Sequence, residues 1–153
     1  MRETHDDANT RIILEPGLAF GTGDHPTTRL CLSWIHDMHK NGIHTLQILD
    51  YGTGSGVLAI AALVMDVADT AVGTDIEPLS VKASKYNASL NNVDDRFHVY
   101  LVGNNHQDPG DTSQYGIIIA NILQGPLVSL APTLAGYRRP SGETLLALSG
   151  ITR

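Results

Sequence analysis

Residues 48–56 read Ile-Leu-Asp-Tyr-Gly-Thr-Gly-Ser-Gly, and the apolar stretch 57–65 follows them directly. Glycine stands at every second position of this turn: Gly52, Gly54 and Gly56. Because glycine lacks a Cβ atom, it adopts positive φ without strain and lets backbone N–H groups approach a ligand closely. The stretch therefore predicts a buried strand that carries an acidic residue, Asp50, near its end, then a ligand-binding turn and a helix.

A second carboxylate, Asp75, follows one strand later. The run 70–75 has the character of a strand, and ligands of open parallel sheets bind at the carboxyl ends of the strands. Asp75 can accept two hydrogen bonds from a ribose diol there. We therefore expect a nucleoside ligand; the alternative is that Asp75 caps the helix beginning near Pro78.

The spacing of the glycines separates two classes of nucleoside cofactor. Dinucleotide sites use Gly-x-Gly-x-x-Gly and hold a pyrophosphate at a helix N-terminus. Here the spacing is Gly-x-Gly-x-Gly, and Val57 occupies the dinucleotide position. With an acid one βα unit later, the pattern resembles the S-adenosylmethionine site of Rossmann-like methyltransferases. A glycine-rich turn without a ligand is the alternative interpretation.

The composition predicts one soluble domain. The chain has 153 residues, of which 42% are hydrophobic and 17% charged, and this suffices for one core. We expect a polar tail over residues 1–11 and a single domain over 12–153. The apolar stretch 57–65 is too short to span a bilayer, so no membrane association is expected. The net charge of −6 argues against direct nucleic-acid binding.

Neither the cysteine nor the histidines indicate a metal or redox site. Cys31 is the single cysteine, so no internal disulfide forms, and its apolar neighbours predict a packed thiol rather than a nucleophile. The seven histidines lack metal-ligand spacing apart from His36 and His39, which have no third ligand nearby. We expect no metal.

Strand-like and helix-like segments alternate along the chain. A helix is expected from a cap at Asp24, with Pro26 in its first turn, to Asn41-Gly42. Further strands are expected at 46–51, 70–75, 97–102, 116–122 and 143–148, and further helices at 57–65, 79–90 and around 127–134. This alternation predicts an α/β fold, a mostly parallel sheet with helices on both faces.

Two more segments reach the same edge of the predicted sheet. Asn121 falls near a strand end, although a lone asparagine can equally satisfy backbone groups in a turn. The loop over residues 20–28 contains Gly-Thr-Gly-Asp-His-Pro-Thr-Thr, whose hydroxyls can reach a cofactor. Its alternative interpretation is a capped helix start.

Together these segments closely resemble the PrmA family of ribosomal-protein methyltransferases. The matching motifs lie at residues 16–23, 25–32, 50–56, 73–78, 121–123 and 148–151. The resemblance runs from about Ile12 to the C-terminus, and its Pro-Gly-Leu-Ala-Phe loop and Asn-Ile-Leu motif are not general features of Rossmann-like methyltransferases. It implies a class I methyltransferase fold and S-adenosylmethionine as cofactor. It further implies a protein substrate, the lysine side chains and N-terminal amine of a large-subunit ribosomal protein.

The resemblance also implies site residues. The matched cofactor contacts are Thr28, Gly52, Asp75 and Asn121, with Phe20 lining the site. Asp50, Gly54 and Gly56 complete the predicted cofactor-binding set. Asn121 is also the candidate catalytic residue, because the family analogy puts its amide near the methyl group, where its oxygen can orient the attacking amine. No general base is required.

The chain departs from the family pattern in three ways. Thr53 stands where bacterial members usually have cysteine. We expect the separate substrate-recognition domain that precedes the motifs in PrmA proteins to be absent, and likewise the last two strands of the sheet. Three alternatives to a ribosomal-protein methyltransferase stay open. The chain could methylate lysines in an electron-transfer flavoprotein subunit, it could be a cofactor-binding module without catalysis, or it could be a nicotinamide-dependent oxidoreductase. We expect a monomer, and the sequence leaves the compartment open.

Overall fold

The computed structural model describes residues 10–17, 25–103, 115–122 and 124–149. Strands and helices alternate as predicted, with bounds that differ from the expected ones by a few residues. The elements are α1 (Pro26–Lys40), β1 (Thr45–Tyr51), α2 (Val57–Val64), β2 (Ala68–Asp75), α3 (Pro78–Leu90), β3 (Phe97–Leu101), β4 (Ile117–Asn121), α4 (Gln124–Gly136) and β5 (Leu145–Ser149).

The five strands form one sheet in the order β3-β2-β1-β4-β5, and all four neighbouring pairs are parallel. The chain builds outward from β1 to β3 and then returns to the other side of β1 with β4. The strand order therefore reverses between β1 and β4, and such a reversal is where open parallel sheets bind ligands. The glycine turn follows β1 at this point.

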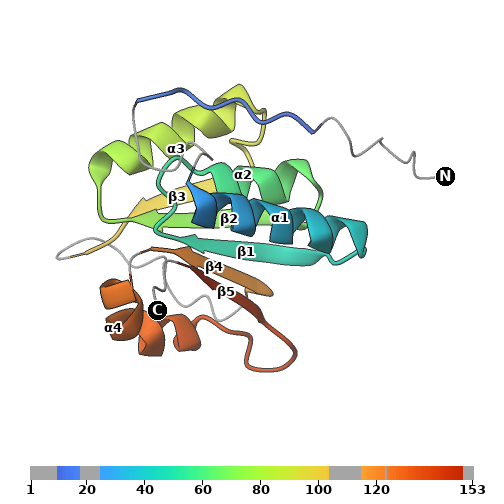
Figure 1. The fold of residues 1–153 in the computed structure, drawn as a ribbon, viewed down its shortest axis with the longest axis vertical. Helices are drawn as coiled ribbons and strands as arrows, with labels where there is room; N and C mark the ends of the chain where they lie inside the picture. The colour runs from blue at the N-terminus through green and yellow to red at the C-terminus, as the bar shows by residue number, and fades with distance from the viewer. Residues whose placement is uncertain (1–9, 18–24, 104–114, 123, 150–153) are drawn as a thin grey trace.

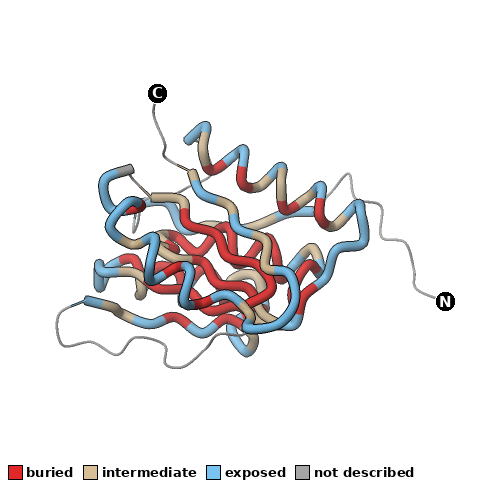
Figure 2. Tube along the Cα trace, turned by 90° about the horizontal axis from the view of Figure 1, so that it is seen from below, coloured by how far each residue is buried: buried red, intermediate tan, exposed pale blue. Residues whose placement is uncertain are grey.

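Helices cover both faces of the sheet, as expected (Figure 1). α1, α2 and α3 lie on one face, where α2 is buried along nearly its whole length. α4 lies on the other face, where Leu127, Leu134 and Tyr137 pack against Leu49 and Ile118. Figure 2 shows the buried residues gathered in the middle of the molecule, with exposed residues around them. The apolar run 57–65 is thus the centre of the larger core.

The cap of α1 differs from the prediction. His25, not Asp24, is the N-cap, and its ring nitrogen accepts a hydrogen bond from the Thr27 N–H. A residue before proline is forced into an extended backbone, and His25 has φ −70° and ψ 137°. Pro26 therefore fixes the first helical position. Asp24 lies outside the described residues.

Among the described strands, β5 lies at one edge of the sheet. Leu146 and Leu148 lie on the same face of the sheet as α4 and are 49% and 43% exposed.

Within the described part of the chain, no helix combines the length and apolarity needed to cross a bilayer.

Candidate functional site

All three glycines of the turn have positive φ, at 71° for Gly52, 55° for Gly54 and 83° for Gly56. Side chains are also excluded by contact at two of them. A Cβ atom at Gly52 would collide with Cγ2 of Ile122, and one at Gly56 would lie 2.9 Å from Cε1 of Phe97. The turn therefore requires glycine for backbone conformation and for close packing.

Asp50 holds this turn against α2. Its Oδ2 atom accepts hydrogen bonds from the Thr53 hydroxyl at 2.8 Å and the Ala59 N–H at 3.3 Å. Burial raises the pKa of the Asp50 carboxyl to about 6; the two hydrogen bonds oppose that shift, and the charge of Asp75 adds to it. Thr53, which stands where bacterial members of the resembling family usually have cysteine, thus stabilises the turn through its side-chain hydroxyl. The sequence interpretation did not predict this hydrogen bond.

Asp75, at the end of β2, ties the glycine turn to the start of α3. Its Oδ2 accepts from the Gly54 N–H at 2.9 Å and its Oδ1 from the Glu77 N–H at 3.0 Å. The N-cap of α3 is Glu77, so Asp75 is not the cap itself. Each carboxylate oxygen has two lone pairs, and the side chain is only partly buried. The carboxylate therefore retains acceptor capacity for a diol.

Asn121, at the end of β4, lies between a helix and a strand. Its amide nitrogen donates to the Thr28 hydroxyl at 3.1 Å, and its amide oxygen accepts from the Ser149 hydroxyl. Thr28 is 2% exposed on α1. The structure thus brings together two predicted residues 93 positions apart in the sequence. The sequence interpretation missed Ser149, although it lies within one of the matching motifs.

Asn87 on α3 is a second residue that the sequence interpretation missed. Its side-chain nitrogen donates to the Ser55 carbonyl in the glycine turn at 2.9 Å. Its oxygen accepts from the Glu15 N–H, also at 2.9 Å. The side chain is 1% exposed, so the segment over residues 10–17 is linked to the turn through one buried amide. The sequence feature that could have indicated this role is the polar residue Asn87 on the buried face of a helix.

The described site residues therefore gather at the carboxyl ends of β1, β2 and β4. They are Thr28, Asp50, Gly52, Gly54, Gly56, Asp75 and Asn121. Phe20 lies outside the described residues. Among the residues that the structure describes, no group of three or more histidine, cysteine, aspartate or glutamate side chains forms a metal-binding cluster.

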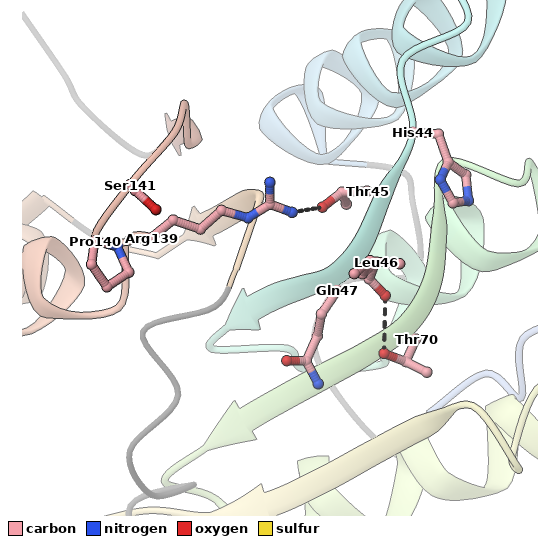
Figure 3. Close-up of a pocket in the computed structure, with 8 residues that line it drawn as sticks. All are labelled: His44, Thr45, Leu46, Gln47, Thr70, Arg139, Pro140 and Ser141. Carbon is pink, nitrogen blue, oxygen red and sulfur yellow. Dashed lines mark hydrogen bonds between the residues drawn. The ribbon is translucent and has the colours of Figure 1, made fainter.

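A hollow of about 700 Å³ lies at the opposite, amino end of the sheet. Residues 44–47, Thr70 and residues 139–141 line it (Figure 3). The Arg139 guanidinium donates to the Thr45 hydroxyl at 2.9 Å, which ties the segment after α4 to β1. None of the predicted site residues lines this hollow, and it lies away from the strand ends where parallel sheets bind ligands.

A family model described as ribosomal protein L11 methyltransferase (PrmA) matches residues 1–153. The chain belongs to this family. The ribosomal protein L11 methyltransferase of Pseudomonas aeruginosa (strain LESB58) is 54% identical over 141 residues, which are 92% of this chain and 44% of that protein. The one of Pseudomonas putida (strain GB-1) is 50% identical over 141 residues, with the same two coverages. The chain thus spans less than half the length of these family members.

Solved structures agree with the family. The ribosomal protein L11 methylase of Lactobacillus delbrueckii subsp. bulgaricus has a TM-score of 0.65 and 34% identity, covering 86% of this chain and 63% of that one. An RNA methyltransferase from Salinibacter ruber, in complex with S-adenosyl-L-homocysteine, has a TM-score of 0.60 and 24% identity, covering 76% and 72%. The five-stranded parallel sheet with its helices is therefore a Rossmann-like class I methyltransferase fold.

Proposed function

We propose that this chain binds S-adenosylmethionine at the carboxyl ends of β1, β2 and β4 and transfers its methyl group to amines of ribosomal protein L11, lysine side chains among them. Membership of the PrmA family supports the activity and the substrate. The complex of the Salinibacter ruber relative with S-adenosyl-L-homocysteine supports the cofactor class.

One observation carries the proposal: the Thr28–Asn121 hydrogen bond and the Gly54–Asp75 hydrogen bond lie at the same end of the sheet. The first joins α1 to β4, and the second joins the glycine turn to β2. Between them they provide an amide, a hydroxyl, a carboxylate with free lone pairs and a turn without Cβ atoms. These groups fit a nucleoside that carries an amino-acid cation, because acceptors suit a ribose diol and carboxylates favour a nearby positive charge.

When bound, S-adenosylmethionine supplies a methyl group that is already activated by the sulfonium charge. The chain then has to hold an amine in line with that group. Asp75 accepts hydrogen bonds from the ribose, and the oxygen of Asn121 orients the N–H groups of the amine. A lysine ammonium loses its proton more easily where burial and a neighbouring positive charge lower its pKa, so none of the described residues has to act as a general base.

Replacing Asn121 tests this assignment. In Asn121→Ala we expect the rate of methyl transfer at saturating cofactor to fall on the order of tenfold, whereas the cofactor Kd changes by less than about threefold, because an orienting contact acts mainly in the transition state. The measurement is radiolabelled methyl transfer to ribosomal protein L11.

The matched control is Asn41→Ala, since the side-chain nitrogen of Asn41 donates to the Asp37 carbonyl at the far end of α1. It should leave rate and affinity unchanged. An Asn121→Ala rate equal to that of the wild type would refute the assignment of Asn121.

A further inference from the structure

The amide of Asn121 is held at both of its ends. Its nitrogen donates to Thr28 on α1, and its oxygen accepts from Ser149 at the end of β5. Asn121 and Ser149 are register partners across the parallel β4–β5 pair, so their side chains lie on the same face. The Ser149 contact therefore follows from the sheet itself and is independent of α1.

The orientation of an asparagine amide decides its chemistry, because its two ends have nearly the same size but opposite hydrogen-bonding character. A rotation by 180° exchanges an acceptor for a donor. Thr28 alone does not prevent this rotation, since its hydroxyl can accept from the nitrogen or donate to the oxygen. Ser149 donates to the oxygen at the other end of the amide, so a rotated amide would have to reverse two hydrogen bonds instead of one.

We propose that Ser149 is a positioning residue, which fixes the amide of Asn121 with its oxygen toward β5. This orientation decides whether Asn121 presents a hydrogen-bond acceptor, its oxygen, or a donor, its nitrogen, to cofactor and amine at a given position. The effect of Ser149 on cofactor and amine rests on the proposed function. The hydrogen bond between Ser149 and Asn121 can be tested without a ligand. The substitutions Ser149→Thr and Ser149→Val suit the test, because they have the same shape and differ only in the hydroxyl.

The first measurement is the side-chain amide signal of Asn121 in ¹⁵N NMR, identified by its loss in Asn121→Ala. In Ser149→Val and Ser149→Ala we expect this signal to shift, because the Asn121 oxygen loses a hydrogen bond. The amide then rotates more freely and its nitrogen bonds less steadily to Thr28, so its hydrogens should exchange with water about twofold to tenfold faster. Ser149→Thr should resemble the wild type. Ser89→Ala is the control, since the hydroxyl of the exposed Ser89 donates to the Tyr86 carbonyl within α3.

The second measurement is a double-mutant cycle on the Kd for S-adenosyl-L-homocysteine. Ser149→Val should weaken binding about twofold relative to Ser149→Thr in the wild-type background. In the Asn121→Ala background the two Ser149 variants should bind equally well. An equal effect in both backgrounds would mean that Ser149 acts without Asn121 and would overturn the proposal.

The two measurements separate this inference from the proposed function. A wild-type chain that does not bind S-adenosyl-L-homocysteine contradicts the function, while the NMR signals still decide whether Ser149 holds the amide. An Asn121 signal that is the same in Ser149→Thr and Ser149→Val overturns the positioning by Ser149, whatever the chain binds.

Discussion

At the scale of single residues, the burial of Asp50 makes the stability of the domain depend on pH. The carboxyl has an ordinary pKa of 3.8 and a folded pKa of about 6, raised chiefly by burial. Between these values the folded state binds more protons than the unfolded state. The stabilisation from this group is therefore complete below pH 3.8 and is lost as the pH rises through 6.

Asp50→Asn should remove this dependence, because the amide has no charge to bury. We expect the free energy of unfolding of the variant, relative to that of the wild type, to rise by on the order of 3 kcal/mol between pH 3.5 and 7. Urea unfolding at a series of pH values measures it. A difference that does not change with pH would show that the carboxyl titrates normally.

Gly52 offers a second test at this scale, since its positive φ and its contact with Ile122 can be separated. Gly42 also has positive φ, at 66°, but a Cβ atom there would meet nothing within 4 Å. We expect Gly42→Ala to cost about 1 kcal/mol from φ alone, and Gly52→Ala to cost roughly 2 kcal/mol more from the steric contact. Thermal unfolding compares the two, and equal losses would exclude a packing requirement at Gly52.

At the scale of elements, α3 connects the segment over residues 10–17 with the glycine turn. Asn91 bonds to both the N–H and the carbonyl of Ile13, at 2.9 Å and 2.7 Å. Asn87 bonds to the same segment and, in addition, to Ser55. Of these two asparagines, Asn87 is therefore the one that links the segment to the glycine turn.

The two asparagines should consequently respond differently to substitution. Asn87→Ala leaves the buried Ser55 carbonyl and the partly buried Glu15 N–H without this partner, so we expect it to lower stability by about 2–3 kcal/mol and to weaken cofactor binding. Asn91→Ala, in more exposed surroundings, should lower stability by about 1 kcal/mol or less and leave cofactor affinity unchanged. Chemical unfolding and calorimetry test both; equal effects on affinity would contradict the link.

The elements and the glycine turn were predictable because their signals are local. The spacing of the glycines, the apolar run behind them and the acid after the next strand each report on a few neighbouring residues. The contacts of Asn87 and Ser149 were not predictable, since they join residues 32 and 28 positions apart and depend on strand register and helix docking. His25 was missed because the constraint from Pro26 outweighs the capping preference of aspartate.

At the scale of the whole molecule, the site depends on the reversal of strand order between β1 and β4. The reversal leaves the turn after β1 accessible at the carboxyl end of the sheet, where Asp75 arrives from one side and Asn121 from the other. The amino end of the sheet is instead tied by contacts such as Arg139–Thr45. The proposed ligand site and the contact between the segment after α4 and β1 thus lie at opposite ends of the sheet.

Calorimetric titration of the chain with S-adenosylmethionine and with NAD tests the central claim most directly. We expect S-adenosylmethionine to bind and NAD to give no heat of binding, because Val57 replaces the third dinucleotide glycine. Asp75→Ala should weaken S-adenosylmethionine binding on the order of a hundredfold, and Glu77→Ala, whose side chain makes no capping bond, should not. Comparable affinity for NAD, or an unchanged Kd in Asp75→Ala, would contradict the account.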